Sequence, residues 1–198
     1  MSAANGRNLD ALVLPPVLDA TCGSRAMWFD KADKRAVFFD RRDEDLPIPK
    51  GKAWPNGGTL RVRPDVQGDF RKMPFPDESF RLVVFDPPHM MKTEEGSNIC
   101  KFYGRLLPDW EGDLAAAFGE CFRVLKDNGV LVFKWCSIEI PVARVIALAP
   151  IPPLFGHTSG RRQQTHWMTF LKQNSVICAT QDGGGDGHNE QRKERTSA

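Results

Sequence analysis

The sequence predicts an α/β fold with a doubly wound, mostly parallel sheet and an antiparallel C-terminal hairpin strand. Two observations support this prediction. Short apolar runs that stop at an aspartate alternate with segments of helical spacing, which is the pattern of strands buried on both faces and joined by crossovers. After the last helical segment, a polar turn lies between two further short runs, as expected for a hairpin at the edge of the sheet.

The individual elements follow from the spacing of apolar residues and from turn signals. The predicted strands span residues 17–19, 35–40, 59–63 or 64–66, 81–85, 130–135 and 165–172. The predicted helices are a brief one through residues 26–28, a longer one from 113 to 125 with Asp113 as its cap, and one over 141–148. Asn128–Gly129 can end the longer helix.

Two segments have the composition of loops. Residues 46–63 are rich in proline and glycine, which favours an irregular, mobile insertion over a crossover helix. Residues 90–112 are polar with scattered aromatic residues and follow the strand 81–85. We expect this second segment to form a lid over the loop that begins at Asp86.

The composition limits the class of protein. The 198 residues suit one domain, which we expect to span 1–180, and the glycine-rich, charged segment 181–198 has the composition of a disordered tail. The net charge of +2 does not indicate binding of nucleic acid by charge alone. Five cysteines without a C-x-x-C pair indicate neither a metal site nor a disulfide framework. With no apolar run of about 20 residues, we expect a cytoplasmic protein without a membrane partner.

The ends of the strands indicate the ligand. A nicotinamide cofactor would favour G-x-G-x-x-G after the first strand, and residues 19–25 contain one glycine. Four strand ends carry acidic residues, at Asp19, Asp40, Asp69 and Asp86. On these positions, and on the segment Gly68–Phe80, the chain resembles the class I S-adenosylmethionine-dependent methyltransferases from about Val17 to Lys172. The resemblance implies a Rossmann-like fold and S-adenosylmethionine as the cofactor.

The resemblance also implies roles for individual residues. Asp19, Cys22 and Gly23 would hold the methionine end of the cofactor, and Asp40 would accept hydrogen bonds from its ribose. Asp69 and Phe70 would hold the adenine, and Asp86 borders the cofactor as well. Ser24 and Arg25 stand where many family members have glycine. Arg25 could therefore pair with the cofactor carboxylate or with a surface acid.

The stretch Asp86-Pro87-Pro88-His89 indicates which kind of substrate the site binds. The two prolines fix φ and remove two N–H donors, so the loop presents a carboxylate and carbonyl oxygens to a ligand that donates N–H groups. An aromatic amine is a weak nucleophile, and Asp86 and the Pro87 carbonyl could hold its two N–H bonds while methyl transfer proceeds by in-line positioning. The motif resembles the (Asp/Asn/Ser)-Pro-Pro-aromatic signature of amino-methyltransferases. His89 stands in the aromatic position, where it could stack on the substrate, hydrogen-bond to it or accept a proton.

We therefore expect methyl transfer to an exocyclic amino nitrogen of a nucleobase in DNA or RNA, with adenine N6 favoured over cytosine N4 and guanine N2. Pro88, His89 and Tyr103 are candidate substrate contacts, and the basic residues Arg41, Arg42, Arg161 and Arg162 could hold the strand. The chain has no obvious separate target-recognition domain, which favours low sequence specificity, a structured RNA, or recognition supplied by a partner or a homodimer. The alternatives are a small-molecule or protein methyltransferase, and a non-catalytic methyltransferase-like binding subunit.

Overall fold

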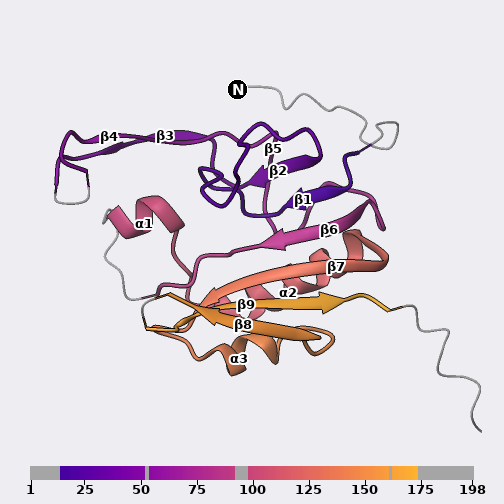
Figure 1. Cartoon of the computed structure of the whole chain (residues 1–198). Coiled ribbons are helices and arrows are strands. Elements are labelled where there is room, and N and C mark those ends of the chain that lie inside the picture. The colour runs from indigo at the N-terminus through magenta and orange to yellow at the C-terminus, as the bar shows by residue number, and fades with distance from the viewer. Residues whose placement is uncertain (1–13, 52–53, 92–97, 161, 174–198) are drawn as a thin grey trace, which may run out of the picture.

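The computed structural model describes residues 14–51, 54–91, 98–160 and 162–173, and a seven-stranded sheet forms its centre (Figure 1). Its strands and helices, in chain order, are β1 (Val17–Asp19), β2 (Ala36–Asp40), β3 (Glu44–Ile48), β4 (Gly58–Val62), β5 (Val66–Gln67), β6 (Phe80–Phe85), α1 (Asn98–Tyr103), α2 (Trp110–Val124), β7 (Leu125–Cys136), α3 (Val142–Ile146), β8 (Phe155–Ser159) and β9 (Thr165–Leu171).

The order of the strands is β5-β2-β1-β6-β7-β9-β8. The pairs of β1 with β2, β1 with β6, and β6 with β7 are parallel, whereas β9 is antiparallel to both β7 and β8. This topology confirms the predicted α/β fold, with its mostly parallel sheet and antiparallel C-terminal hairpin. The chain order reverses between β1 and β6, which is where open α/β sheets bind ligands.

Three predicted elements were wrong. The brief helix predicted through residues 26–28 is a series of turns, and the φ values of 50° at Gly23 and 58° at Arg25 prevent a right-handed helix from extending back through those residues. The insertion at 46–63 contains the antiparallel hairpin of β3 and β4, in which Pro47 is tolerated on an edge strand. The helix α2 begins at Trp110 with Asp109 at its N-cap, so Asp113 lies in its first turn.

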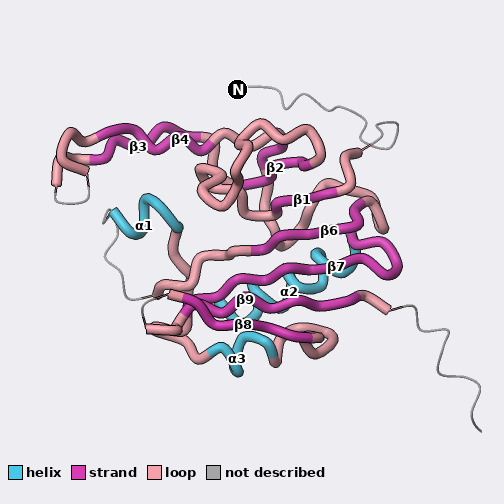
Figure 2. Tube along the Cα trace, viewed as in Figure 1, coloured by secondary structure: helices cyan, strands magenta, loops and turns pink. Residues whose placement is uncertain are grey.

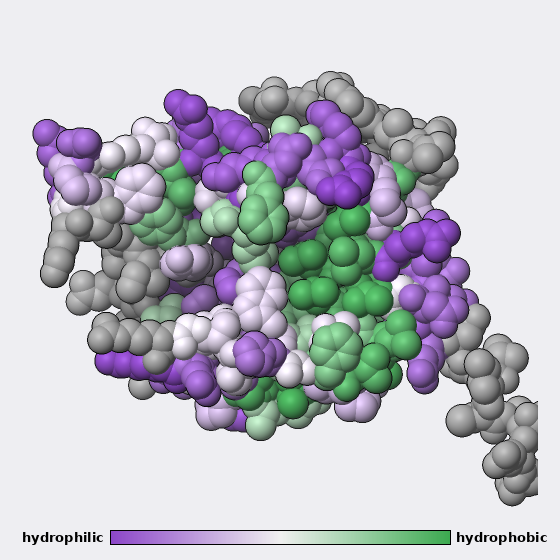
Figure 3. Space-filling model, viewed as in Figure 1, coloured by the Kyte–Doolittle hydropathy of each residue, from purple (hydrophilic) through white to green (hydrophobic). Residues whose placement is uncertain are grey.

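The two faces of the central strands differ in burial. Val83, Leu131 and Phe170 point to one face and are fully buried in a core that includes residues of α3 and of α2, the helix behind the sheet in Figure 1. On the opposite face, Leu82, Val130 and Leu171 lie in register and are only partly buried. Figure 3 shows a broad apolar area on this side of the molecule, which no described helix covers.

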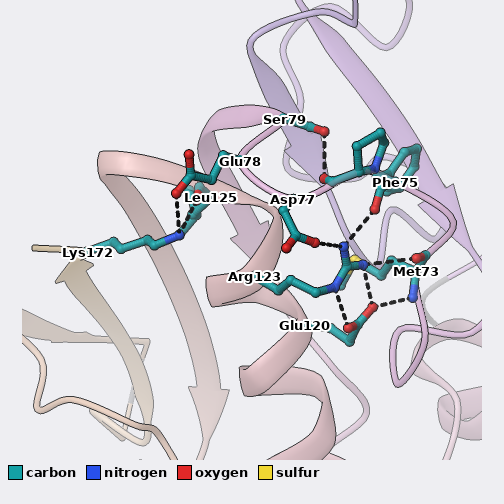
Figure 4. Close-up of polar contacts among 10 residues, drawn as sticks. Met73, Phe75, Asp77, Glu78, Ser79, Glu120, Arg123, Leu125 and Lys172 are labelled. Carbon is teal, nitrogen blue, oxygen red and sulfur yellow. Dashed lines mark hydrogen bonds and ion pairs between the residues drawn. The ribbon is translucent and has the colours of Figure 1, made fainter. Parts of the chain in front are cut away.

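The link between β5 and β6 is fixed by one arginine of α2 (Figure 4). Arg123 donates to both carboxylate oxygens of Glu120, to Asp77, and to the backbone carbonyls of Met73 and Phe75, at 2.7–3.0 Å. These bonds use all five N–H donors of the guanidinium. At the start of the same link, a Cβ on Gly68 would lie 2.7 Å from the Phe39 ring, so only glycine fits there.

Candidate active site

A cavity of about 810 Å³ opens at the carboxyl ends of β1, β2 and β6. The hairpin β3–β4 and the helix α1 project beyond these strand ends (Figures 1 and 2), and residues of both line the cavity. Most of the predicted site residues line it together, namely Cys22, Gly23, Asp40, Asp69, Phe70, Asp86, Pro87, Pro88, His89 and Tyr103. The fold thus gathers one site from residues that are far apart in the sequence.

Asp86 follows β6 directly, and its side chain is 13% exposed. Its backbone N–H donates to Thr21 Oγ1 at 2.9 Å, which fixes the start of the Pro-Pro loop against the turn after β1. One carboxylate oxygen, Oδ2, accepts a hydrogen bond from Lys134 Nζ at 2.5 Å. No partner for the other oxygen is found within the described part of the chain. Asp86 therefore keeps an acceptor for a ligand while its charge is compensated.

Lys134, the partner of Asp86, is a residue of the candidate site that the sequence did not indicate. It lies on β7 opposite Trp167 of β9, with its Nζ 5.6 Å from the centre of the Trp167 ring. The available signal was a single charged residue within the apolar run 130–135, at a position that faces the less covered side of the sheet. Pairing with Asp86 depends on the alignment of two neighbouring parallel strands, which a sequence pattern does not specify.

His89 lies between the rings of Tyr103 and Trp135, with ring centres 6.0 and 6.1 Å apart. Burial lowers the pKa of His89, while the Asp86 carboxylate and the Pro87 backbone act in the opposite direction. The buried Nδ1 atom has no hydrogen-bond partner among the described residues. An unsatisfied buried polar atom is unfavourable, so the packing of the described residues alone does not explain this nitrogen.

Asp40 ends β2 and organises the turn after β1. Its Oδ2 accepts from the Gly23 backbone N–H at 2.8 Å, and its Oδ1 accepts from the Arg42 backbone N–H at 2.9 Å. The Arg42 guanidinium lies 3.4 Å from the same oxygen and donates to the Lys101 carbonyl of α1. A carboxylate can accept about four hydrogen bonds, so Asp40 retains capacity for a hydroxyl donor. Arg42, in contrast, has a structural role in joining Asp40 to α1.

Asp69 and Phe70 form another wall of the cavity. Arg71 donates to both oxygens of Asp69 and also bonds to Asp113, and the hydrogen bonds from Arg71 hold the pKa of Asp69 below its usual range. Asp69 is therefore an ionised acceptor that is already shared with an arginine. Phe70 packs edge-on against Phe85 at 5.6 Å, which links this wall to the core.

Asp19 and Cys22 interact mainly with other residues of the protein. Asp19 is fully buried and does not line the cavity; it accepts hydrogen bonds from the Thr21 backbone N–H and from Trp28 Nε1 at 3.2 and 2.7 Å. Burial raises the pKa of the Cys22 thiol, which keeps it neutral and unreactive. Asp19 thus shapes the turn after β1 from beneath, while Gly23 and Cys22 meet the cavity.

Asp19 should make stability depend on pH. Burial raises its pKa from 3.8 to about 6, so between these values the native state binds a proton that the unfolded chain does not. The free energy of unfolding should therefore fall as the pH rises from 4 to 6, by up to about 3 kcal/mol from this group. Urea unfolding of the wild type and of Asp19→Asn at several pH values measures the effect. Equal pH slopes in the two proteins would contradict it.

The lid predicted at 90–112 contacts the Pro-Pro loop through its described part. Gly104 ends α1 with φ 75°, and a Cβ at this position would lie 3.0 Å from Pro88 Cγ. The Leu106 backbone N–H donates to the Met90 carbonyl at 2.9 Å. The helix α1 within this segment was not predicted, and its close approach to Pro88 requires glycine.

Arg25 and Arg162 do not both lie at the main cavity as candidate ligand contacts. Arg25 bonds to the carbonyls of Lys31 and Arg63 and pairs with Asp65 at 3.1 Å, the second of its two predicted alternatives. Arg162 lies apart from the main cavity, beside a smaller one of about 300 Å³ near Cys136 and Gln164. Arg161 and the predicted tail 181–198 lie outside the described residues.

The fold and the site define an α/β protein with a large ligand cavity at the reversal point of a mostly parallel sheet. No family model and no curated protein matches the chain. The fold is similar to that of the PH0226 protein from Pyrococcus horikoshii OT3, with 16% identity, a TM-score of 0.48, and 80% of this chain and 81% of that chain covered. It is also similar to HI0767 from Haemophilus influenzae, a proposed methylase, with 14% identity, a TM-score of 0.42, and 84% and 91% covered.

Within the described ranges, no group of three or more histidine, cysteine, aspartate or glutamate side chains could hold a metal ion. None of the described helices has the length and hydropathy needed to cross a membrane.

Proposed function

We propose that this chain is an S-adenosylmethionine-dependent methyltransferase that acts on an exocyclic amino nitrogen of a nucleobase in DNA or RNA, with adenine N6 favoured. One observation carries the proposal. The Asp86-Pro87-Pro88-His89 loop lies in the same cavity as Asp40, Asp69 and the glycine turn after β1. An amine-binding loop and a set of acceptors suited to a nucleoside cofactor therefore meet in one space.

The cavity has the size and the chemistry for the cofactor. Its volume of about 810 Å³ lies within the range of small-molecule sites and leaves room for a base beside the cofactor. Asp40 can accept further hydrogen bonds from the ribose hydroxyls. Gly23 has no side chain, so its backbone is open to the cofactor, and the atom nearest to a Cβ built on it lies 3.8 Å away. Phe70 offers an apolar surface for adenine. Bound S-adenosylmethionine would supply an electrophilic methyl group.

The residues of the chain would act mainly by positioning. The unpartnered oxygen of Asp86 and the Pro87 carbonyl would accept the two N–H bonds of the target amine and turn its lone pair toward the methyl group. Lys134 would hold the Asp86 carboxylate in place. His89, largely buried with a lowered pKa, would be neutral and could stack on the target or accept a hydrogen bond or a proton from it.

The proposal is tested by transfer of tritiated methyl groups from S-adenosylmethionine to DNA, RNA, proteins and low-molecular-weight compounds. Label in a polynucleotide, followed by mass spectrometry of its nucleosides, would identify the base and the nitrogen. Label only in protein or small molecules would instead establish one of the other methyltransferase activities. Calorimetry that detects no cofactor binding would reject the enzyme and favour a binding subunit.

A further inference from the structure

Four aromatic side chains follow one another along the cavity. Trp54, from the loop between β3 and β4, stacks on Phe102 of α1 with ring centres 6.1 Å apart and planes 27° apart. Phe102 is 6.1 Å from Tyr103, and Tyr103 is 6.0 Å from His89. All four line the cavity. They form a row, termed the aromatic row below, that leads from the outer hairpin to the Asp86 loop.

The members of the aromatic row differ in how much they are exposed. Phe102 packs against the small core of the β3–β4 hairpin, formed by residues such as Leu60 and Val62. Trp54 and Tyr103 are 44% and 53% exposed. Packing therefore explains the position of Phe102, but it does not explain why the large rings of Trp54 and Tyr103, on either side of Phe102, are exposed. Exposed rings beside a cavity are suited to stacking on flat ligands.

Positive charge is concentrated at the same cavity. Eight lysine and arginine residues and four aspartates line it, although the whole chain has a net charge of only +2. The four aspartates are already compensated, since Asp40 pairs with Arg42, Asp69 and Asp113 with Arg71, and Asp86 with Lys134. Arg41, Arg61 and Arg105 have no ion pair recorded among the described residues, and all three are exposed. The lining therefore favours a ligand with several negative charges.

We infer that the substrate is a single-stranded polynucleotide that lies along the aromatic row. This inference rests on the proposed function and specifies its substrate. The target base occupies the Asp86 loop beside His89, neighbouring bases stack on Tyr103 and Trp54, and Arg105 and Arg41 contact phosphates. Bases within a duplex are stacked on each other and cannot reach separate protein rings. Stacking on aromatic side chains tolerates any base, so the row provides affinity with little sequence preference.

Fluorescence anisotropy with labelled single-stranded DNA, single-stranded RNA and duplex DNA tests the inference on the full chain. We expect a single strand to bind more tightly than the duplex, and Trp54→Ala or Tyr103→Ala to weaken its binding about tenfold or more. Arg105→Ala should reduce the slope of log K against log salt by about 0.7, the value for one phosphate contact to a single strand. Comparing DNA with RNA would identify which polymer is preferred.

Phe29→Ala and Arg81→Ala are the matched controls, because Phe29 and Arg81 are exposed and do not line the cavity. Both should bind the single strand as the wild type does. Circular dichroism and cofactor binding establish that Trp54→Ala and Tyr103→Ala are folded, and Tyr103→Phe should retain binding. Tighter binding of the duplex, or unchanged binding by both folded alanine variants, would overturn the inference. Methyl transfer to a base of duplex DNA or of folded RNA would still support the proposed function in that case.

Discussion

Replacing Asp86 with alanine is expected to lower the rate of methyl transfer by about 10²- to 10³-fold. The proposed role of this carboxylate is to hold the reacting amine, and loss of one such contact typically costs 10²–10³-fold. Cofactor affinity should change little, because the proposed contacts with the ribose and the methionine end come mainly from Asp40 and Gly23. Single-turnover kinetics and calorimetry with S-adenosylmethionine measure the two quantities separately.

The ion pair with Lys134 provides an internal control for this prediction. Lys134→Met should also reduce the rate, since Asp86 would lose the partner that orients it. In the Asp86→Ala background, however, Lys134→Met should have little further effect, because residues that act through one another are not additive. Asp127→Ala, on the same strand and outside the cavity lining, should leave the rate unchanged. Near-normal turnover of Asp86→Ala would refute the assignment.

The largest effect on stability is expected for Arg123→Met. This change would leave the Met73 and Phe75 carbonyls without their donor and Glu120 without its cation. Each lost partner in a partly buried network costs about 1–3 kcal/mol, and we expect a total of about 2–4 kcal/mol after allowing for the partial exposure of Arg123. The midpoint of urea unfolding, with an unchanged m-value, measures this loss.

Arg144→Ala is the matched control for Arg123. Arg144 pairs with Glu111, but both side chains are more than half exposed, so its removal should cost no more than about 1 kcal/mol. The pH dependence offers a second check. Arg123 lowers the pKa of Glu120, so this pair stabilises the fold above the ordinary glutamate pKa and less as the pH falls. If Arg123→Met and Arg144→Ala lost equal stability, the role given to Arg123 would be wrong.

The apolar periodicity was sufficient to predict most strands and the class of the sheet. Continuous apolar runs predicted β2, β6 and the second half of β7, but only β2 is buried on both faces, whereas β6 and β7 alternate between buried and partly buried residues. Turn composition was less informative. The prolines and glycines of residues 46–63 predicted a loop, whereas cross-strand pairing and packing of Leu60 and Val62 against Phe102 produce a hairpin. Such packing depends on α1, which is distant in sequence.

By itself, the sequence determined the acidic strand ends and the rigid Asp-Pro-Pro-His loop, because these are local consequences of residue type and spacing. The tertiary structure decided how the acids are used. Asp19 is buried beneath the turn, Asp40 and Asp69 are shared with arginines, and Asp86 is paired with Lys134 on the next strand. The aromatic row likewise combines a hairpin, a helix and a loop. Contacts of this kind follow from the alignment of distant segments in the folded chain, which no local pattern encodes.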